Sequence, residues 1–364
     1  MTNSQMPVVK ITDLAKSYGA VEALKGVDLE VGAGEYFVLL GPSGGGKTTL
    51  LRLIGGFIRP TRGELLLHGR DVSNLPPDKR PTSMVFQSYA LFPHMSVAQN
   101  VGYGLRLKKL PKAEIKDKVD AMLDMVGLIG LGGRQPHELS GGQQQRVQLA
   151  RSLVLERDIL LLDEPLAALD AQLRKDMCFE LKHLQEKVGI TFIHVTHNQE
   201  EAMTVADRIA VIADGELVEA GTAKQIYERP EKRFTAGFIG ENNIFESKVT
   251  AVSNKTVRVE LGASEITVPR RNVDVKKGAR IWVSIRSELL DVKPSGQKPK
   301  AGWEVLDGTY SEAIYLGLVT SHIVTLKDGR QVNIRKVSGG DKVLKPGKSV
   351  CISWRQDDAR LYLM

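Results

Sequence analysis

The sequence contains little cysteine and no long hydrophobic run. Its two cysteines, Cys178 and Cys351, lie far apart without metal-binding or redox spacing, which is the usage expected in a reducing compartment. No segment approaches the roughly 20 apolar residues of a membrane helix, and Met1 to Lys10 lacks the apolar core of a signal peptide. We therefore expect a cytoplasmic protein that cannot itself be a membrane channel. Any transport path would have to be formed by separate membrane subunits.

Charge is distributed unevenly along the 364 residues. Residues 1–240 carry 29 basic and 29 acidic side chains, whereas residues 241–364 carry 21 and 14. The net charge of +7 therefore lies entirely in the last third. The length exceeds that of a typical single domain, and the shift in composition predicts a boundary near residue 240. We expect two domains, 1–240 and 241–364.

A glycine-rich segment matches the pattern of a phosphate-binding loop, G-x-x-x-x-G-K-[ST]. Its residues are Gly41, Pro42, Ser43, Gly44, Gly45, Gly46, Lys47 and Thr48. Glycines let backbone N–H groups approach phosphate oxygens, and the helix expected from Thr48 and Thr49 onward would direct the positive end of its dipole at the anion. Lys47 is expected to reach the β- and γ-phosphates, and the Thr48 hydroxyl to bind Mg²⁺. The apolar run 36–40 before the loop predicts the strand that such a loop requires.

The same loop also contains G-x-S-x-G, the nucleophile elbow of serine hydrolases, which likewise joins a strand to a helix. An elbow does not need Lys47 or Thr48. No histidine is obviously paired with a downstream acid in the order expected of a hydrolase. The sequence therefore favours triphosphate binding.

An acidic pair follows a second apolar run, Ile159 to Leu162. A continuous apolar run is typical of a strand buried on both faces of a parallel sheet. Ligands of such sheets bind outside the carboxyl ends of the strands, so Asp163 is placed to hold Mg²⁺ and Glu164 to face the γ-phosphate and act on water. A solvated acidic pair after a core strand is the alternative, and the phosphate loop weighs against it.

A third apolar strand, Thr191 to Thr196, ends at His197. A histidine at a strand end is usually only a hydrogen-bonded residue. Because His194 and His197 would point to opposite faces of the strand, a shared metal is disfavoured. His197 becomes a candidate γ-phosphate contact because two other strand ends already converge on phosphate.

Between the phosphate loop and the acidic pair lies the sequence LSGGQ, at Leu139 to Gln143. Ser140 and the amides of Gly141 and Gly142 would form a second anion site at a helix N-terminus. With this segment, the chain resembles the ATP-binding cassette (ABC) family along essentially its whole length, specifically the ATPase subunits of bacterial importers. The resemblance implies an α/β fold, in which a phosphate-loop NTPase cassette with an inserted helical subdomain at about 88–150 is followed by a small all-β OB-like accessory (TOBE) domain.

Further roles are implied by the resemblance alone. Tyr18 matches the aromatic side chain that stacks on adenine, although it would otherwise be an ordinary edge-strand tyrosine. Gln87 matches the glutamine that holds Mg²⁺ and contacts the membrane subunit, and Asp170 matches the loop that crosses the dimer interface. In the family, two cassettes dimerise head to tail, so that Ser140 and Gln143 of one cassette cap the ATP of the other. The implied ligands are ATP and Mg²⁺, with catalytic roles for Lys47, Gln87, Glu164 and His197.

The expected partners follow from the same resemblance: a second copy of the chain, integral membrane permease subunits on the cytoplasmic face of the bacterial membrane, and indirectly a periplasmic substrate-binding protein. Residues 92–97, close to Gln87, are expected either to form a groove that receives a permease helix or to pack the helical subdomain. The junction at 238–245 resembles that of spermidine and putrescine importer ATPases. Iron, sugar, glycerol-phosphate and sulfate importers share nearly all the other motifs.

A nucleic-acid-associated ATPase is the competing interpretation, because the tail is basic and OB-type barrels also bind nucleic acid. Five aromatic residues could stack on bases, namely Trp282, Trp303, Tyr310, Tyr315 and Trp354. Large aromatics in small β-domains are more often core residues. A long coiled coil or second cassette would be expected in such a protein, and the sequence has neither. We therefore expect no nucleic-acid partner.

Overall fold

The computed structural model describes residues 6–87, 90–271, 273–296, 300–339 and 344–364. It divides into two compact units, of which the first ends at Glu228 and the second begins at Arg229. The boundary thus falls before α9 (Arg233–Phe238), whereas the composition placed it near residue 240. Helix α9 belongs with the second unit because Asn242 Nδ2 donates to the Ala236 carbonyl at 2.6 Å. Similarly, the Tyr362 hydroxyl donates to the Pro230 carbonyl at 3.3 Å.

The first unit contains a six-stranded sheet in the order β10-β9-β3-β8-β7-β6. Its strands are β3 (Tyr36–Leu40), β6 (Thr82–Val85), β7 (Ile159–Asp163), β8 (Thr191–Thr196), β9 (Arg208–Ala213) and β10 (Glu216–Thr222). All neighbours are parallel except β9 and β10. Every residue of β3, β7 and β8 is buried, which explains their unbroken apolar runs. Because these three strands are neighbours, the residues that follow them meet at one edge of the sheet.

A second, antiparallel sheet of this unit has the order β2-β1-β4-β5. Its strands are β1 (Val9–Tyr18), β2 (Val21–Val31), β4 (Arg62–Leu67) and β5 (Arg70–Asp71). One apolar cluster joins this sheet to the parallel sheet and to helix α1 (Lys47–Gly55), and it includes Leu14, Leu50 and Ile193. Burial of these side chains fixes α1 between the two sheets, directly after the glycine-rich loop.

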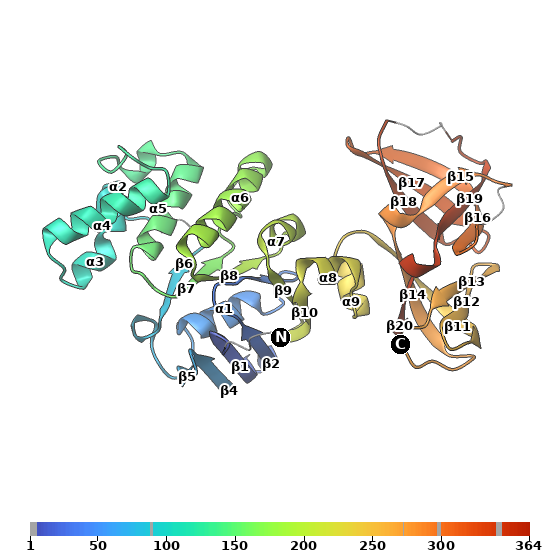
Figure 1. The fold of residues 1–364 in the computed structure, drawn as a ribbon, viewed down its shortest axis with the longest axis horizontal. Helices are drawn as coiled ribbons and strands as arrows, with labels where there is room; N and C mark the ends of the chain where they lie inside the picture. The colour runs from blue at the N-terminus through green and yellow to red at the C-terminus, as the bar shows by residue number, and fades with distance from the viewer. Residues whose placement is uncertain (1–5, 88–89, 272, 297–299, 340–343) are drawn as a thin grey trace. The chain divides into compact units, whose positions relative to one another are not determined.

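The remaining helices of the unit are α2 (Val97–Val101), α3 (Tyr103–Leu107), α4 (Lys112–Met125), α5 (Gly141–Leu153), α6 (Ala171–Val188), α7 (Gln199–Val205) and α8 (Ala223–Glu228), with short 3₁₀ helices η1 (Pro77–Lys79) and η2 (Pro136–Glu138). Figure 1 shows α2 to α5 gathered together, away from the antiparallel sheet. These helices share an apolar cluster of their own, and Val97 belongs to it with no exposed surface. The predicted start of this helical region, Ser88, lies outside the described residues.

The second unit contains two five-stranded antiparallel sheets, β13-β12-β11-β14-β20 and β15-β19-β16-β17-β18. The strands are β11 (Asn242–Val252), β12 (Thr256–Leu261), β13 (Ser264–Pro269), β14 (Arg280–Arg286), β15 (Asp291–Pro294), β16 (Trp303–Tyr315), β17 (Val319–Leu326), β18 (Gln331–Val337), β19 (Ser349–Arg355) and β20 (Arg360–Leu363), with 3₁₀ helices η3 (Ser287–Leu289) and η4 (Gln356–Asp358). One apolar cluster draws side chains from both sheets. The predicted fold class, a phosphate-loop cassette followed by an OB-like β-domain, is confirmed.

Residues 327–330 form the turn between β17 and β18, where Gly329 adopts a φ of 86°. In the described part of the chain, no helix combines the length and the apolar character that a membrane crossing requires.

Candidate functional site

The glycine-rich loop joins β3 to α1 and depends on the absence of side chains. A Cβ at Gly41 would lie 1.9 Å from the Ile212 carbonyl oxygen, and one at Gly46 would lie 2.7 Å from the Ala23 carbonyl oxygen. Gly46 is also the N-cap of α1 at a φ of 106°, which a residue with a Cβ rarely adopts. Glycine is therefore required at both positions, and the loop places Thr48 and Thr49 in the first turn of the helix.

Lys47 begins α1, and its side chain folds back over the loop. The ammonium donates to the carbonyl oxygens of Gly41 at 2.9 Å and Pro42 at 2.8 Å. Burial lowers the pKa of Lys47, and the carboxylates of Glu164 and Asp163 oppose this shift. The loop therefore carries a buried ammonium with two carboxylates nearby. The ammonium has the charge that suits a bound phosphate, and the carboxylates have the charge that suits a metal ion.

Thr48 and Asp163 meet at the carboxyl end of β7. The Thr48 hydroxyl donates to Asp163 Oδ1 at 3.0 Å. Burial raises the pKa of Asp163, whereas the hydrogen bond from Thr48 lowers it. A hydroxyl and a carboxylate side by side form the kind of incomplete oxygen site that Mg²⁺ occupies when phosphate supplies further ligands. Among the described residues, no cluster of three or more His, Cys, Asp or Glu could hold a metal without such help.

Glu164 has a left-handed backbone conformation, with a φ of 46°. This region is sparsely populated by residues other than glycine, and such strain occurs most often at functional sites. The conformation is held by a hydrogen bond from the Glu164 amide to the Val195 carbonyl at 3.0 Å. Its side chain is reached from two other segments, by Gln87 Nε2 at 3.3 Å and by His197 Nδ1 at 3.4 Å, both to Oε2.

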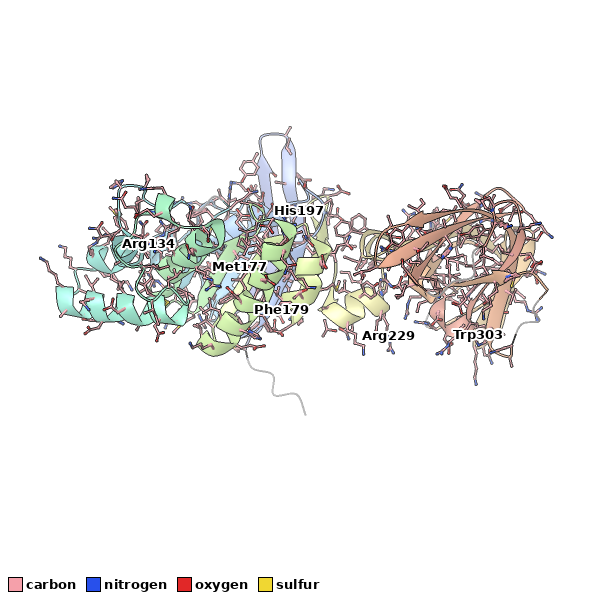
Figure 2. All side chains as sticks on the ribbon, turned by 90° about the horizontal axis from the view of Figure 1, so that it is seen from above. Arg134, Met177, Phe179, His197, Arg229 and Trp303 are labelled. Carbon is pink, nitrogen blue, oxygen red and sulfur yellow. The ribbon has the colours of Figure 1, made fainter. Side chains whose placement is uncertain are left out.

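His197 follows β8 and is half-exposed, and Figure 2 labels it among the strands and helices of the first unit. His194 lies within β8, is fully buried and shares a hydrogen bond of 3.1 Å between its Nδ1 and the Tyr36 hydroxyl. Burial lowers the pKa of His194 to about 3, so this imidazole is neutral at physiological pH. The two histidines therefore differ in environment, because His194 is buried inside β8 and His197 is half-exposed after its end.

The LSGGQ segment forms the start of α5, with Ser140 as the N-cap. The Ser140 hydroxyl accepts from the Gln143 amide at 3.4 Å, and Gln143 Oε1 accepts from the Ser140 amide at 3.0 Å. This reciprocal capping box fixes the exposed hydroxyl at the helix N-terminus, beside Gly141 and Gly142. Within the residues that the structure describes, no hydrogen bond links Ser140 or Gln143 to the phosphate loop.

Tyr18 ends β1 with half of its surface exposed, and the Lys16 ammonium lies 5.1 Å from the centre of its ring.

Asp170 is the N-cap of α6, where its carboxylate accepts from the Leu173 amide at 3.0 Å. Helix α6 buries Met177 while Phe179 remains about half-exposed, and Figure 2 labels both side chains. Asp170 thus has a structural role within one chain that the sequence analysis did not assign to it.

The aromatic residues of the second unit differ in exposure. Trp354 and Tyr310 are almost completely buried, at 1% and 2% exposure, and belong to the core of that unit. Trp282 lies beneath the Arg233 guanidinium at 4.5 Å, and Trp303 lies 6.0 Å from that of Arg355. Trp354 and Tyr310 are therefore core residues. Neither can stack on a base, which removes two of the five candidates.

Two polar residues escaped the sequence analysis. Arg80 is buried and donates to the carbonyls of Leu53 and Ile54 at the end of α1, at 2.6 and 2.9 Å. Glu201 is buried and contacts Thr196, Arg174 and His194. Arg80 lies in no motif. Glu201 lies in residues 197–202, which resemble the switch-histidine segment of the family, but the resemblance assigned no role to its carboxylate. Each of the two contacts residues more than 25 positions away as well as near ones. The capping box at Ser140, in contrast, follows the pattern S-x-x-Q and could have been recognised.

Together, these features define an ATP-binding cassette: a phosphate loop between a buried strand and a helix, an acidic strand end beside it, and a capped LSGGQ helix in the attached subdomain. A comparison with family models agrees. Residues 24–167 match the model described as "ABC transporter", and residues 283–361 match the model described as "TOBE domain".

Similar proteins cover nearly the whole chain. The spermidine/putrescine import ATP-binding protein PotA of Thermobifida fusca is 43% identical over 98% of this chain and 94% of its own length. The protein of that name from Ruegeria pomeroyi is 46% identical over 94% of this chain and 92% of its own length. The chain belongs to the family of ATP-binding proteins of ABC transporters, and it therefore binds nucleotide.

Solved structures support the fold of the first unit. CbiO1 of Clostridium perfringens, described as part of an ABC transporter complex, is 31% identical with a TM-score of 0.58, over 61% of this chain and 91% of its own. The ATP-binding cassette MJ0796, described as a dimer bound to ADP and Pi, is 33% identical with a TM-score of 0.53, over 59% of this chain and 98% of its own.

Proposed function

We propose that this protein is the ATP-hydrolysing subunit of a bacterial ABC import system. It acts with integral membrane permease subunits at the cytoplasmic face of the membrane. The observation that carries the proposal is the convergence on Glu164. Its carboxylate lies next to the phosphate loop and is reached by Gln87 and His197 from two other segments, at 3.3 and 3.4 Å. Positioned polar groups of this kind are what in-line phosphoryl transfer to water requires.

In this mechanism, Lys47 and the amides of the loop neutralise phosphate charge, and Glu164 orients and deprotonates the attacking water. His197 contacts the γ-phosphate, and Tyr18 stacks on the adenine. Negative charge on the β- and γ-phosphates would be offset by Mg²⁺, for which Thr48, Asp163 and Gln87 offer oxygen ligands. The adjacent oxygens of Thr48 and Asp163, 3.0 Å apart, support this assignment.

The working form is a head-to-tail homodimer. The exposed N-terminus of α5 offers the Ser140 hydroxyl and the amides of Gly141 and Gly142 to an anion, and the γ-phosphate of a second subunit has the matching charge. Asp170 would lie at the same interface. A dimer is also how MJ0796 is described in its nucleotide-bound structure. In such an arrangement, each composite site takes its phosphate loop from one subunit and its LSGGQ segment from the other.

The imported solute is a polyamine, spermidine or putrescine. This proposal rests on relatives that carry this name at 40% to 46% identity over at least 94% of this chain. A periplasmic substrate-binding protein would deliver the solute to the permease. Iron, sugar, glycerol-phosphate and sulfate are the alternative solutes. A nucleic-acid partner is not expected, since Trp354 and Tyr310 are core residues.

The decisive experiment compares ATP hydrolysis by the wild-type protein and by Glu164→Gln. The substitution keeps the size of the side chain but removes its basicity, so turnover should fall by ~10²-fold or more while ATP still binds. Glu114→Gln makes the same change of charge on the exposed face of α4 and should leave turnover unchanged. Near-normal hydrolysis by Glu164→Gln would remove the role assigned to this carboxylate.

A further inference from the structure

A buried carboxylate lines the same small cavity as His197. Glu201, in the first turn of α7, is 5% exposed. Its Oε2 accepts a hydrogen bond of 2.7 Å from the Thr196 hydroxyl, and its Oε1 lies 3.5 Å from Arg174 Nε. Burying a charged group costs free energy unless it is paired and hydrogen-bonded. Oε2 also lies 3.8 Å from Nε2 of the buried His194. The hydrogen bond from Thr196 and the ion pair with Arg174 lead to two different segments of the site.

The first partner controls the backbone on both sides of His197. Thr196 is the last residue of β8, and its hydroxyl accepts from the Asn198 amide at 3.0 Å. Because that hydroxyl donates its hydrogen to Glu201, its lone pairs face the Asn198 amide. One side chain thus ties the residue before His197 to the residue after it. The carboxylate of Glu201 determines the direction of that hydroxyl.

The second partner controls the segment that follows Glu164. Arg174, in the first turn of α6, donates from Nη2 to the Leu169 carbonyl at 2.8 Å and from Nε to the Leu166 carbonyl at 3.4 Å. Arginine presents its donors in a rigid planar fork, so fixing one edge of the guanidinium orients the others. The pairing with Glu201 therefore bears on residues 166–169, between Glu164 and the capping Asp170.

The two branches enclose a small polar cavity of about 50 Å³ next to the proposed base. Its walls include Glu164, His197, Thr196, Arg174 and Glu201. The network therefore borders the reacting groups without containing a group proposed to touch the nucleotide. Small displacements of positioned groups cost much of the rate even when they lie outside the first contacts, and ~1 Å can cost ~10²-fold.

We propose that Glu201 is a positioning residue, which holds His197 and the segment after Glu164 in a single arrangement that hydrolysis requires and nucleotide binding does not. This inference rests on the proposed ATPase function. A purely structural role would predict a loss of stability with no specific loss of turnover. A positioning role predicts that Glu201 acts on the rate through His197.

The test measures ATP affinity, kcat and thermal stability for Glu201→Gln in the full-length protein. We expect the Kd for ATP to stay within about twofold and kcat to fall by ~10-fold or more. Glu200→Gln removes the same charge one residue earlier, from an exposed side chain of α7, and should not change kcat. Thr196→Val, which removes only the hydroxyl of the His197 branch, should lower kcat in the same way, and it decides the question if Glu201→Gln does not fold.

A double-mutant cycle separates positioning from stability. In a His197→Ala background, Glu201→Gln should reduce kcat by less than about twofold further, because its effect passes through the residue already removed. The inference is overturned if the two losses multiply, or if Glu201→Gln and Thr196→Val both keep wild-type kcat. A wild-type protein that does not hydrolyse ATP at all would instead overturn the proposed function.

Discussion

At the scale of single residues, the site uses conformations and charges that are unfavourable in isolation. The left-handed backbone of Glu164 costs on the order of 1–3 kcal/mol for a residue with a side chain. Glycine would relieve this strain but would remove the carboxylate to which Gln87 and His197 extend. A purely structural turn could use glycine at this position. The presence of a strained glutamate instead is consistent with a role in chemistry.

Tyr18 offers a direct test of how the protein binds the base of the nucleotide. Its ring is half-exposed at the end of β1, so Tyr18→Ala should not disturb the core. We expect ATP to bind more weakly by roughly 1–3 kcal/mol, the usual scale for loss of an aromatic stack on a base. Calorimetric titration would measure this difference. Tyr18→Phe keeps the ring and should bind as the wild type does, and equal affinities for all three proteins would return Tyr18 to an ordinary surface role.

His194 predicts a pH dependence of stability. Its pKa is lowered to about 3 by burial, against about 6.5 in an unfolded chain. Between these values the unfolded chain binds a proton that the folded protein does not, so the free energy of unfolding decreases as the pH falls. Between pH 6.5 and pH 5 the loss amounts to about 2 kcal/mol.

Denaturant unfolding of the wild type and of His194→Gln at both pH values would measure this contribution. Groups away from His194 titrate in both proteins and cancel in the difference. Glu201 Oε2 lies 3.8 Å from His194 Nε2, so the difference reports His194 together with this neighbour. The variant should lose about 2 kcal/mol less on acidification. His183→Gln removes an exposed histidine from α6 and should leave the pH dependence unchanged. Parallel curves for wild type and His194→Gln would contradict the prediction.

At the scale of the element, helix α1 depends on a capping residue that lies outside it. The Arg80 guanidinium donates to the carbonyls of Leu53 and Ile54 at the end of the helix, and also to that of Leu75 at 2.9 Å. Burial lowers the pKa of Arg80 to about 10, so the group remains charged at neutral pH. The C-terminus of the helix that carries Lys47 and Thr48 is therefore held both by this buried side chain and by the backbone amide of its C-cap, Gly56, which donates to the Leu53 carbonyl at 3.2 Å.

Arg80→Met should destabilise the protein by ~2–4 kcal/mol, because several buried carbonyls lose their donor at once. Denaturant unfolding of the first unit would measure the change. Lys79→Met replaces the exposed basic residue next to it and should change stability by less than about 0.5 kcal/mol. If both variants are equally stable, water replaces the guanidinium and the cap contributes little.

Which parts of the site a sequence can predict depends on how local the pattern is. Gly41 to Thr48, the strand end at Asp163 and the LSGGQ segment are contiguous patterns, each with a physical reason for its residue types, and the structure forms strand, loop and helix there. Glu201 and Arg80 are different, because their importance comes from contacts with distant backbone and side chains. No spacing rule connects Arg174 to Glu201, so the network that joins Thr196, Glu201 and Arg174 could be found only from the fold.

At the scale of the whole molecule, the question is how hydrolysis would reach a membrane partner. The segment after Gln87 was expected either to receive a permease helix or to pack the helical subdomain. The structure divides these roles, since Val97 is fully buried whereas Phe92 is partly exposed. Phe92 packs on Tyr103 with ring centroids 4.6 Å apart, and the Arg151 guanidinium lies 5.6 Å from its ring. Phe92 is therefore the candidate of this pair for contact with a permease helix.

Phe92→Ala should uncouple ATP hydrolysis from solute import. Its ring makes no contact with the phosphate loop among the described interactions, so the isolated subunit should keep its ATPase activity within about twofold. Uptake of spermidine by the assembled transporter should fall by ~10-fold, as expected for loss of an aromatic anchor that is buried at an interface. Leu107→Ala truncates a more exposed apolar residue of α3 in the same subdomain and should leave both activities unchanged. Full uptake by Phe92→Ala would place the permease contact elsewhere on the subunit, and a parallel loss of ATPase activity would show that Phe92 supports the fold of the cassette rather than its coupling.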